Sequence, residues 1–173
     1  CSQSRGLGDV YKRQIMSEVY LGNPNLKKAN TAIEFTEEQV IEFLKCKEDP
    51  VYFANNYIKI VSLDEGLTQF SPYDFQEKLI HNFHENRFNI CKMPRQTGKS
   101  TTVVSYLLHY AVFNDSVNIG ILANKAATAR ELLQRLQTAY ENLPKWMQQG
   151  ILSWNKGSME LENGSKILAA STS

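Results

Sequence analysis

The sequence has few of the residues and segments that define several classes of protein. Its 173 residues contain three cysteines, Cys1, Cys46 and Cys91, which lack metal-ligand spacing and are too few for a disulfide framework. No apolar run approaches the roughly 20 residues that a membrane span needs, and no internal repeat or low-complexity segment is present. These absences exclude a disulfide scaffold and a repeat protein, argue against a membrane partner, and favour a reducing, cytoplasmic setting.

The composition that remains is that of a globular protein. Hydrophobic residues make up 42% of the chain and charged residues 21%. The length suffices for one domain with a sizeable core, or for one domain and a small appendage.

The first fourteen residues stand apart from the rest. The run Asp9-Val10-Tyr11-Lys12-Arg13-Gln14 resembles the translation of a transposon-type sequencing adapter, so we expect residues 1–14 to be a non-native segment and the reading frame to begin at Met16. Without this segment the formal net charge changes from +1 to −1. Overall charge therefore provides no argument for nucleic-acid binding, and any such surface must be a local patch.

Periodicity and capping signals predict an alternation of helices and strands after a flexible arm over residues 15–35. Thr36 and Gln39 form a capping box, and Asp49-Pro50 and Ser71-Pro72 are further helix starts. Helices are predicted over 36–47, 51–57, 71–84, 99–114 and 125–142. Strands are predicted over 58–61, 88–92, 117–123 and 151–154, with a turn at 64–66 and a C-terminal β-hairpin over 159–167 around Asn163-Gly164.

The order of strand, helix, strand and helix from residue 88 to 142 indicates a right-handed βαβ crossover and a parallel sheet, hence an α/β fold. A doubly wound sheet of about five strands needs more chain than follows Leu168. We therefore expect an incomplete sheet, and we interpret Ser171-Thr172-Ser173 as a cut. Cys91 is expected to be buried in the strand over 88–92.

The most informative segment joins that expected strand to the helix at residue 99. It reads Met93-Pro94-Arg95-Gln96-Thr97-Gly98-Lys99-Ser100. A strand, a tight loop with Gly-Lys-Ser and a helix form the arrangement that cradles phosphates, with Lys99 reaching the β- and γ-phosphates and Ser100 ligating Mg²⁺. Met93 stands where the first glycine is usual, and Pro94 fixes φ instead.

Several residues in this loop and in the helices before and after it each allow two interpretations. Arg95 lies in the loop and either offsets charge at a γ-phosphate or pairs with a surface carboxylate. Gln76 has the donor and acceptor that adenine recognition requires, and Phe75 or Tyr73 either stacks on the base or belongs to the core. On the helix over 125–142, basic residues either meet a DNA backbone or form a solvated face; these are Lys125, Arg130 and Arg135.

Taken in order, these segments resemble the large terminase subunit of tailed bacteriophages, an ATP-driven DNA-packaging motor. The resemblance runs from about Asp49 to Ser173. It rests on Asp49 to Val61 as an entry segment, on Tyr73-Asp74-Phe75-Gln76 as an adenine motif, and on Arg95 to Thr101 as a variant Walker A without its first glycine. Further matching blocks are Gly120 to Lys125, Trp154-Asn155-Lys156-Gly157-Ser158 and Asn163-Gly164-Ser165.

The resemblance implies a RecA-like P-loop ATPase domain, of which residues 71–173 would be the N-terminal part, preceded by a small helical subdomain over 36–70. It implies ATP and Mg²⁺, with Lys99 and Arg95 catalytic and Ser100 on the metal. The nucleotide-binding set would be Phe75, Gln76, Pro94, Arg95, Gln96, Thr97, Gly98, Lys99, Ser100 and Thr101.

For the full-length protein the resemblance further implies a nuclease domain and a ring of identical subunits. Partners would be double-stranded DNA, the portal protein and the small terminase subunit, in the cytoplasm of the infected bacterium and transiently at the procapsid portal. No Walker B strand ending in Asp-Glu is found before Ser173, so we expect the given chain to bind nucleotide weakly and to hydrolyse it poorly. A helicase-like nucleic-acid translocase and a non-catalytic remnant remain as alternatives.

Overall fold

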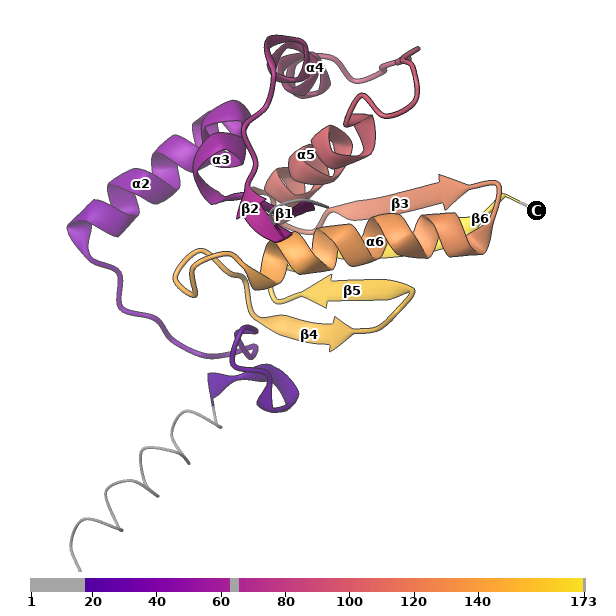
Figure 1. Ribbon diagram of the computed structural model, residues 1–173. Coiled ribbons are helices and arrows are strands. Elements are labelled where there is room, and N and C mark those ends of the chain that lie inside the picture. Colours follow the sequence, from indigo (N-terminus) through magenta and orange to yellow (C-terminus); the bar gives the residue numbers. More distant parts are fainter. Residues whose placement is uncertain (1–17, 63–65, 173) are drawn as a thin grey trace, which may run out of the picture.

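A four-stranded mixed sheet carries the helices that position the candidate site (Figure 1). The computed structural model describes residues 18–62 and 66–172. Its elements are the 3-10 helix η1 (Tyr20–Gly22), the helices α2 (Glu37–Glu48), α3 (Pro50–Tyr57), α4 (Asp74–Glu85), α5 (Lys99–Phe113) and α6 (Ala126–Glu141), and the strands β1 (Lys59–Ser62), β2 (Gly66–Gln69), β3 (Asn118–Ala123), β4 (Ile151–Trp154), β5 (Ser158–Leu161) and β6 (Lys166–Ser171).

The expected α/β class is confirmed, but the sheet is mixed and not parallel. Its order is β3-β6-β5-β4, in which only the β3–β6 pair is parallel. Strands β4, β5 and β6 form an antiparallel meander. The chain returns from β4 to β6 through short connections, and such connections join antiparallel neighbours, whereas a parallel neighbour needs a long crossover.

The strand expected over 88–92 is absent from the described part of the chain. These residues form no helix and pair with no described strand, and the Phe88 and Ile90 side chains are 82% and 101% exposed. Cys91, expected to be buried, is exposed as well. Alternating apolar residues indicate a strand only where a neighbouring strand satisfies their backbone groups, and no described strand lies beside this segment.

Helix boundaries follow the sequence signals closely. The Thr36 hydroxyl accepts a hydrogen bond from Gln39 N at 3.3 Å, and the Gln39 side-chain oxygen accepts one from Thr36 N at 3.1 Å. The Asp49 carboxylate accepts hydrogen bonds from the backbone N–H groups of the next helix, with Pro50 at its first position. The expected helices are therefore confirmed within a few residues, although α4 begins at Asp74, later than its Ser71-Pro72 signal predicted.

The two hairpins differ from expectation in detail. Strand β2 was not predicted; it pairs with β1, and most of the turn expected at 64–66 lies outside the described residues. Between β5 and β6 four residues form the connection, longer than the two-residue turn that Asn163-Gly164 suggested. Only Gly164 there has a positive φ, +80°, because Asn163 instead donates its side-chain amide to the carbonyl groups of Ala111 and Asn114.

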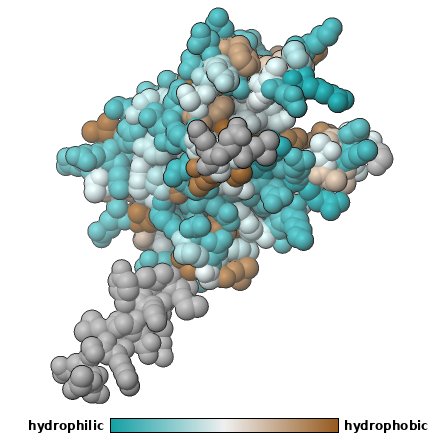
Figure 2. Space-filling model, viewed as in Figure 1, coloured by the Kyte–Doolittle hydropathy of each residue, from teal (hydrophilic) through white to brown (hydrophobic). Residues whose placement is uncertain are grey.

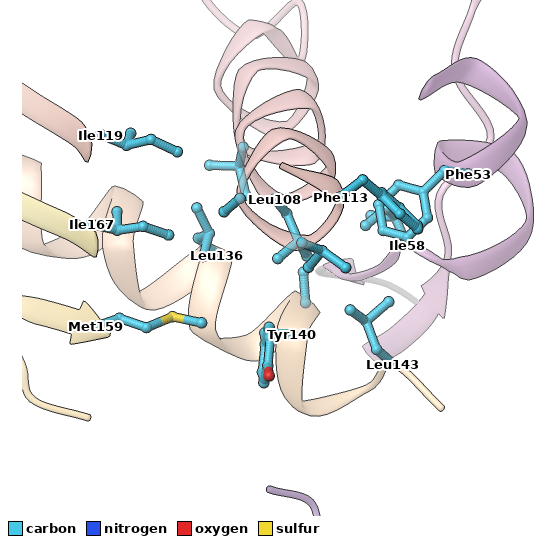
Figure 3. Close-up of a cluster of buried hydrophobic side chains, with 14 of the residues drawn as sticks. Phe53, Ile58, Leu108, Phe113, Ile119, Leu136, Tyr140, Leu143, Met159 and Ile167 are labelled. Atoms are coloured by element: carbon cyan, nitrogen blue, oxygen red, sulfur yellow. The ribbon is translucent and has the colours of Figure 1, made fainter. Parts of the chain in front are cut away.

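The core lies between the sheet and the helices α5 and α6 (Figure 3). Strands β3, β5 and β6 turn Ile119, Met159 and Ile167 toward Leu136 and Tyr140 of α6. Helix α5 connects this layer to α3, where Phe53 packs edge-on against Phe113. The sheet therefore holds α6 directly and α5 through α6, which sets the position of the loop that precedes α5.

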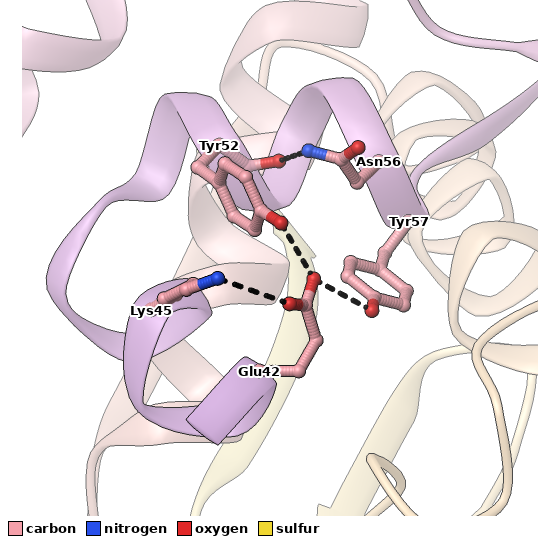
Figure 4. Close-up of polar contacts among 5 residues, drawn as sticks. All are labelled: Glu42, Lys45, Tyr52, Asn56 and Tyr57. Atoms are coloured by element: carbon pink, nitrogen blue, oxygen red, sulfur yellow. Dashed lines mark hydrogen bonds and ion pairs between the residues drawn. The ribbon is translucent and has the colours of Figure 1, made fainter. Parts of the chain in front are cut away.

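A carboxylate joins α2 to α3 (Figure 4). Glu42 Oε1 accepts hydrogen bonds from the hydroxyl groups of Tyr52 and Tyr57, at 2.8 and 2.9 Å, and Lys45 lies 3.9 Å from Oε2. The hydrogen bond from Tyr52 is the largest cause of a lowered pKa at Glu42, whereas burial raises the pKa of Tyr57. These contacts fix the small helical group that packs beside α5.

Residues 18–30 of the segment expected to be a flexible arm are docked on the sheet edge. Leu26 is buried, Ile151 N donates to Lys27 O, and Lys28 forms a parallel bridge with Ile151. Gln148 joins arm and body, because its Oε1 accepts from Lys27 N and its Nε2 donates to Asn25 O. The arm thus covers β4, which would otherwise be an open edge.

Gln148→Ala should release this arm and destabilise the chain by about 1–3 kcal/mol, because buried backbone groups lose their partners. Limited proteolysis would show faster cleavage over residues 23–30, and chemical denaturation would show the loss of stability. Gln149→Ala removes a neighbouring side chain that bonds to Val112 O instead and should leave the arm protected. Equal protection in the Gln148 variant and the wild type would contradict this role.

The face shown in Figure 2 is mostly hydrophilic, with hydrophobic residues in separate patches. On the sheet face turned away from α6, Leu122 and Leu168 are more than half exposed.

Among the helices that the structure describes, none combines the length and apolar character needed to cross a membrane.

Candidate phosphate-binding loop

The loop that precedes α5 is tightly curled over residues 94–98. Gln96 has φ +62° and Gly98 has φ +72°, so two residues separated by a single residue adopt the left-handed conformation. The Thr97 hydroxyl donates to Pro94 O at 3.1 Å and holds the loop in this shape. Left-handed residues within a short loop turn successive N–H groups toward a common concave side, which is a geometry that binds anions.

Lys99 turns back over this loop. Its Nζ donates to Pro94 O at 2.8 Å, so the ammonium group lies across the curl, while Lys99 also begins α5. Among residues 18–62 and 66–172, no acceptor pairs with the backbone N–H groups of Lys99, Ser100 or Thr101. A helix N-terminus with free N–H groups carries a partial positive charge, and a lysine beside it adds a full one.

Gln76 of α4 holds the loop by a hydrogen bond from its side chain. Its side chain is 3% exposed, accepts a hydrogen bond from Tyr73 N at 2.9 Å and donates one to Thr97 O at 3.2 Å. A Cβ on Gly98 would lie 2.5 Å from Gln76 Nε2. The structure therefore brings Gln76 to the loop, as a side chain that holds α4 and the loop together and that would have to move to admit a Cβ at position 98. The contact joins residues 21 positions apart, and no local pattern in the sequence predicts it.

The aromatic residues beside Gln76 are outside the core. The Tyr73 and Phe75 side chains are 70% and 45% exposed, and their rings stack at 5.9 Å with an interplanar angle of 11°. Of the two interpretations left open by the sequence, the core one is wrong for both rings. They form an exposed aromatic platform on the element that contacts the loop through Gln76.

Arg95 lies exposed in the loop, and in the part of the chain that the structure describes no carboxylate comes within ion-pair distance of it. It is therefore free to contact a ligand. Within the described ranges, no group of three or more His, Cys, Asp or Glu side chains is arranged so that it could hold a metal ion. Ser100, the second residue of α5, carries the hydroxyl that would hold a metal together with phosphate oxygens.

The site thus combines a curled loop, a lysine across it, free helix N–H groups and an exposed aromatic pair. Pro94, Gln96 and Thr101 also lie in or next to the curl. A comparison with protein families finds that residues 90–173 match the family described as terminase large subunit, T4likevirus-type, N-terminal. The match begins at residue 90, shortly before the loop, and includes α5, the whole four-stranded sheet and α6. Residues 90–173 of the chain therefore belong to the terminase large subunit family.

Proposed function

We propose that this chain carries the ATP-binding part of a motor that packages double-stranded DNA, with a P-loop domain of the RecA-like type. Family membership supports a role in phage DNA packaging in general. The observation that carries the finer proposal is the curled loop with Lys99 turned across it and the unpaired N–H groups that follow.

In this proposal each residue has a distinct task. The N–H groups of Ser100 and Thr101 bind phosphate oxygens. The Lys99 ammonium group gives up its hydrogen bond to Pro94 O and instead contacts oxygens of the β- and γ-phosphates. The Ser100 hydroxyl holds Mg²⁺, which, when bound, neutralises phosphate charge. Arg95, unpaired and exposed, offsets the charge that develops on the γ-phosphate.

The purine base would stack on the exposed Tyr73 and Phe75 rings, since aromatic pairs favour a further flat ring. Gln76 has its Oε1 and Nε2 already engaged by Tyr73 N and Thr97 O. We therefore assign Gln76 mainly to holding the loop, with one lone pair and one hydrogen left for the base. The subunit ring, the portal protein and the small terminase subunit remain proposals for the full-length protein.

Nucleotide titration of the 173-residue chain tests this function. Isothermal titration with ATP and Mg²⁺ should show binding, and Lys99→Ala should weaken it about 10–100-fold, because one charge-assisted contact contributes about 1.5–3 kcal/mol. Lys92→Ala removes an exposed lysine outside the curl and should leave the affinity unchanged. Equal affinities for wild type and Lys99→Ala would refute the proposal.

A further inference from the structure

A groove of about 600 Å³ lies between α6 and the turn that joins β4 to β5. Arg130 and Glu131 line it from the helix, and Trp154 and Lys156 line it from the strand and the turn. The two sides are fixed to one another, because the largely buried Gln137 of α6 donates a hydrogen bond to Asn155 O at 3.0 Å. This bond holds the turn that carries Lys156 against the helix that carries Arg130.

The groove carries uncompensated positive charge. In the described ranges neither Arg130 nor Lys156 has a carboxylate within ion-pair distance. Glu131, the one acidic residue of the lining, is paired with Arg135 at 2.7 Å. The first turn of α6 holds no acidic residue, and its N-terminal end adds a partial positive charge. An anionic ligand fits this groove better than a neutral one.

The chemistry of the lining favours the backbone of a duplex over a single strand. Single-stranded nucleic acids are held by aromatic rings on which their bases stack. The one aromatic residue here, Trp154, is partly buried and packs against Tyr140, with ring centroids 5.8 Å apart. With no free ring, the groove can contact phosphates by charge and by side-chain amides, which is how proteins bind duplex DNA without reading its sequence.

We propose that this groove binds the phosphate backbone of double-stranded DNA, with Arg130 and Lys156 each contacting a phosphate. The inference names a DNA-contacting surface for the proposed packaging function and rests on that function. It is distinct from the nucleotide loop, since none of the residues that line the groove belongs to the loop or to α4.

Fluorescence anisotropy of a labelled duplex, without nucleotide, tests the inference over a series of salt concentrations. Arg130→Gln/Lys156→Gln should reduce affinity about tenfold or more and lower the slope of log K against log salt by about 1.8, because two phosphate contacts are lost. Lys47→Gln/Lys78→Gln removes the same charge from exposed positions on α2 and α4 and should retain most of the affinity and the wild-type slope.

A gain of affinity provides a test that misfolding cannot imitate. Glu131→Gln removes the acidic group from the lining and frees Arg135, so it should bind the duplex several-fold more tightly with a steeper salt dependence. Lys99→Ala should bind DNA like the wild type, which separates failure of the groove from failure of the nucleotide site. The inference is overturned if the wild type does not bind the duplex, if the groove and control variants weaken equally, or if a single strand of the same sequence binds more tightly through these two residues.

Discussion

Gly98→Ala should reduce ATP affinity by more than about 100-fold, which corresponds to about 3 kcal/mol, and should lower the stability of the chain as well. Two costs combine at this position. A side chain at φ +72° is strained by about 1–2 kcal/mol, and the new Cβ would lie 2.5 Å from Gln76 Nε2. The loop can relieve the clash only by uncurling or by displacing the buried Gln76, which would break its contacts with Tyr73 and Thr97.

A matched pair of variants separates the two costs. Gly120→Ala adds the same methyl group in β3, where nothing lies within 4 Å of the new Cβ and φ is not positive, so affinity should not change. Combining Gly98→Ala with Gln76→Ala removes the clash but retains the strain, and it should recover part of the stability lost by Gly98→Ala alone. Wild-type affinity in Gly98→Ala would show that the curled loop does not bind the nucleotide.

Lowering the pH from 7 to 4 should reduce stability by about 3 kcal/mol through His109 alone. Burial lowers the pKa of His109 to about 4, from 6.5 in the unfolded chain. The folded protein therefore keeps this imidazole neutral while the unfolded chain binds a proton below pH 6.5. The contribution is fully present above pH 6.5 and is lost as the pH falls toward 4.

The surroundings of His109 explain why the neutral form is favoured. Its Nε2 donates to Cys46 O at 2.8 Å, and within the described part of the chain its buried Nδ1 has no partner. The Phe53 and Phe113 rings pack against it, and His84 lies 6.2 Å away, ring to ring. A proton on Nδ1 would thus place a charge among aromatic rings, close to a second histidine.

Urea denaturation at a series of pH values measures this effect. His109→Gln should show a flatter loss of stability than the wild type between pH 7 and 4, because glutamine does not titrate. His81→Gln, an exposed histidine on α4, should follow the wild-type curve. Parallel curves for wild type and His109→Gln would rule out His109 as the source of the acid sensitivity.

Local signals in the sequence determined the helices and the loop. The capping residues Thr36 and Asp49 mark helix starts by hydrogen bonds to N–H groups only a few residues away. In the same way, Gly98 and Lys99 indicate a curled loop before a helix. Tolerance of a positive φ is a property of glycine itself, and the positive charge is a property of lysine itself. The family resemblance also rested on such short, ordered motifs and is confirmed by the match over residues 90–173.

Only the tertiary structure decided which strands pair and which side chains find partners far away in the sequence. Phe88 and Ile90 alternate like residues of a strand, yet no described strand lies beside them. Gln76 reaches Thr97 across 21 positions, Gln148 reaches Asn25 across 123, and Gln137 fixes the turn that brings Lys156 opposite Arg130. A backbone group or a charge acquires a partner only when the whole chain has packed, because the partner is distant in sequence, and no local pattern carries that information.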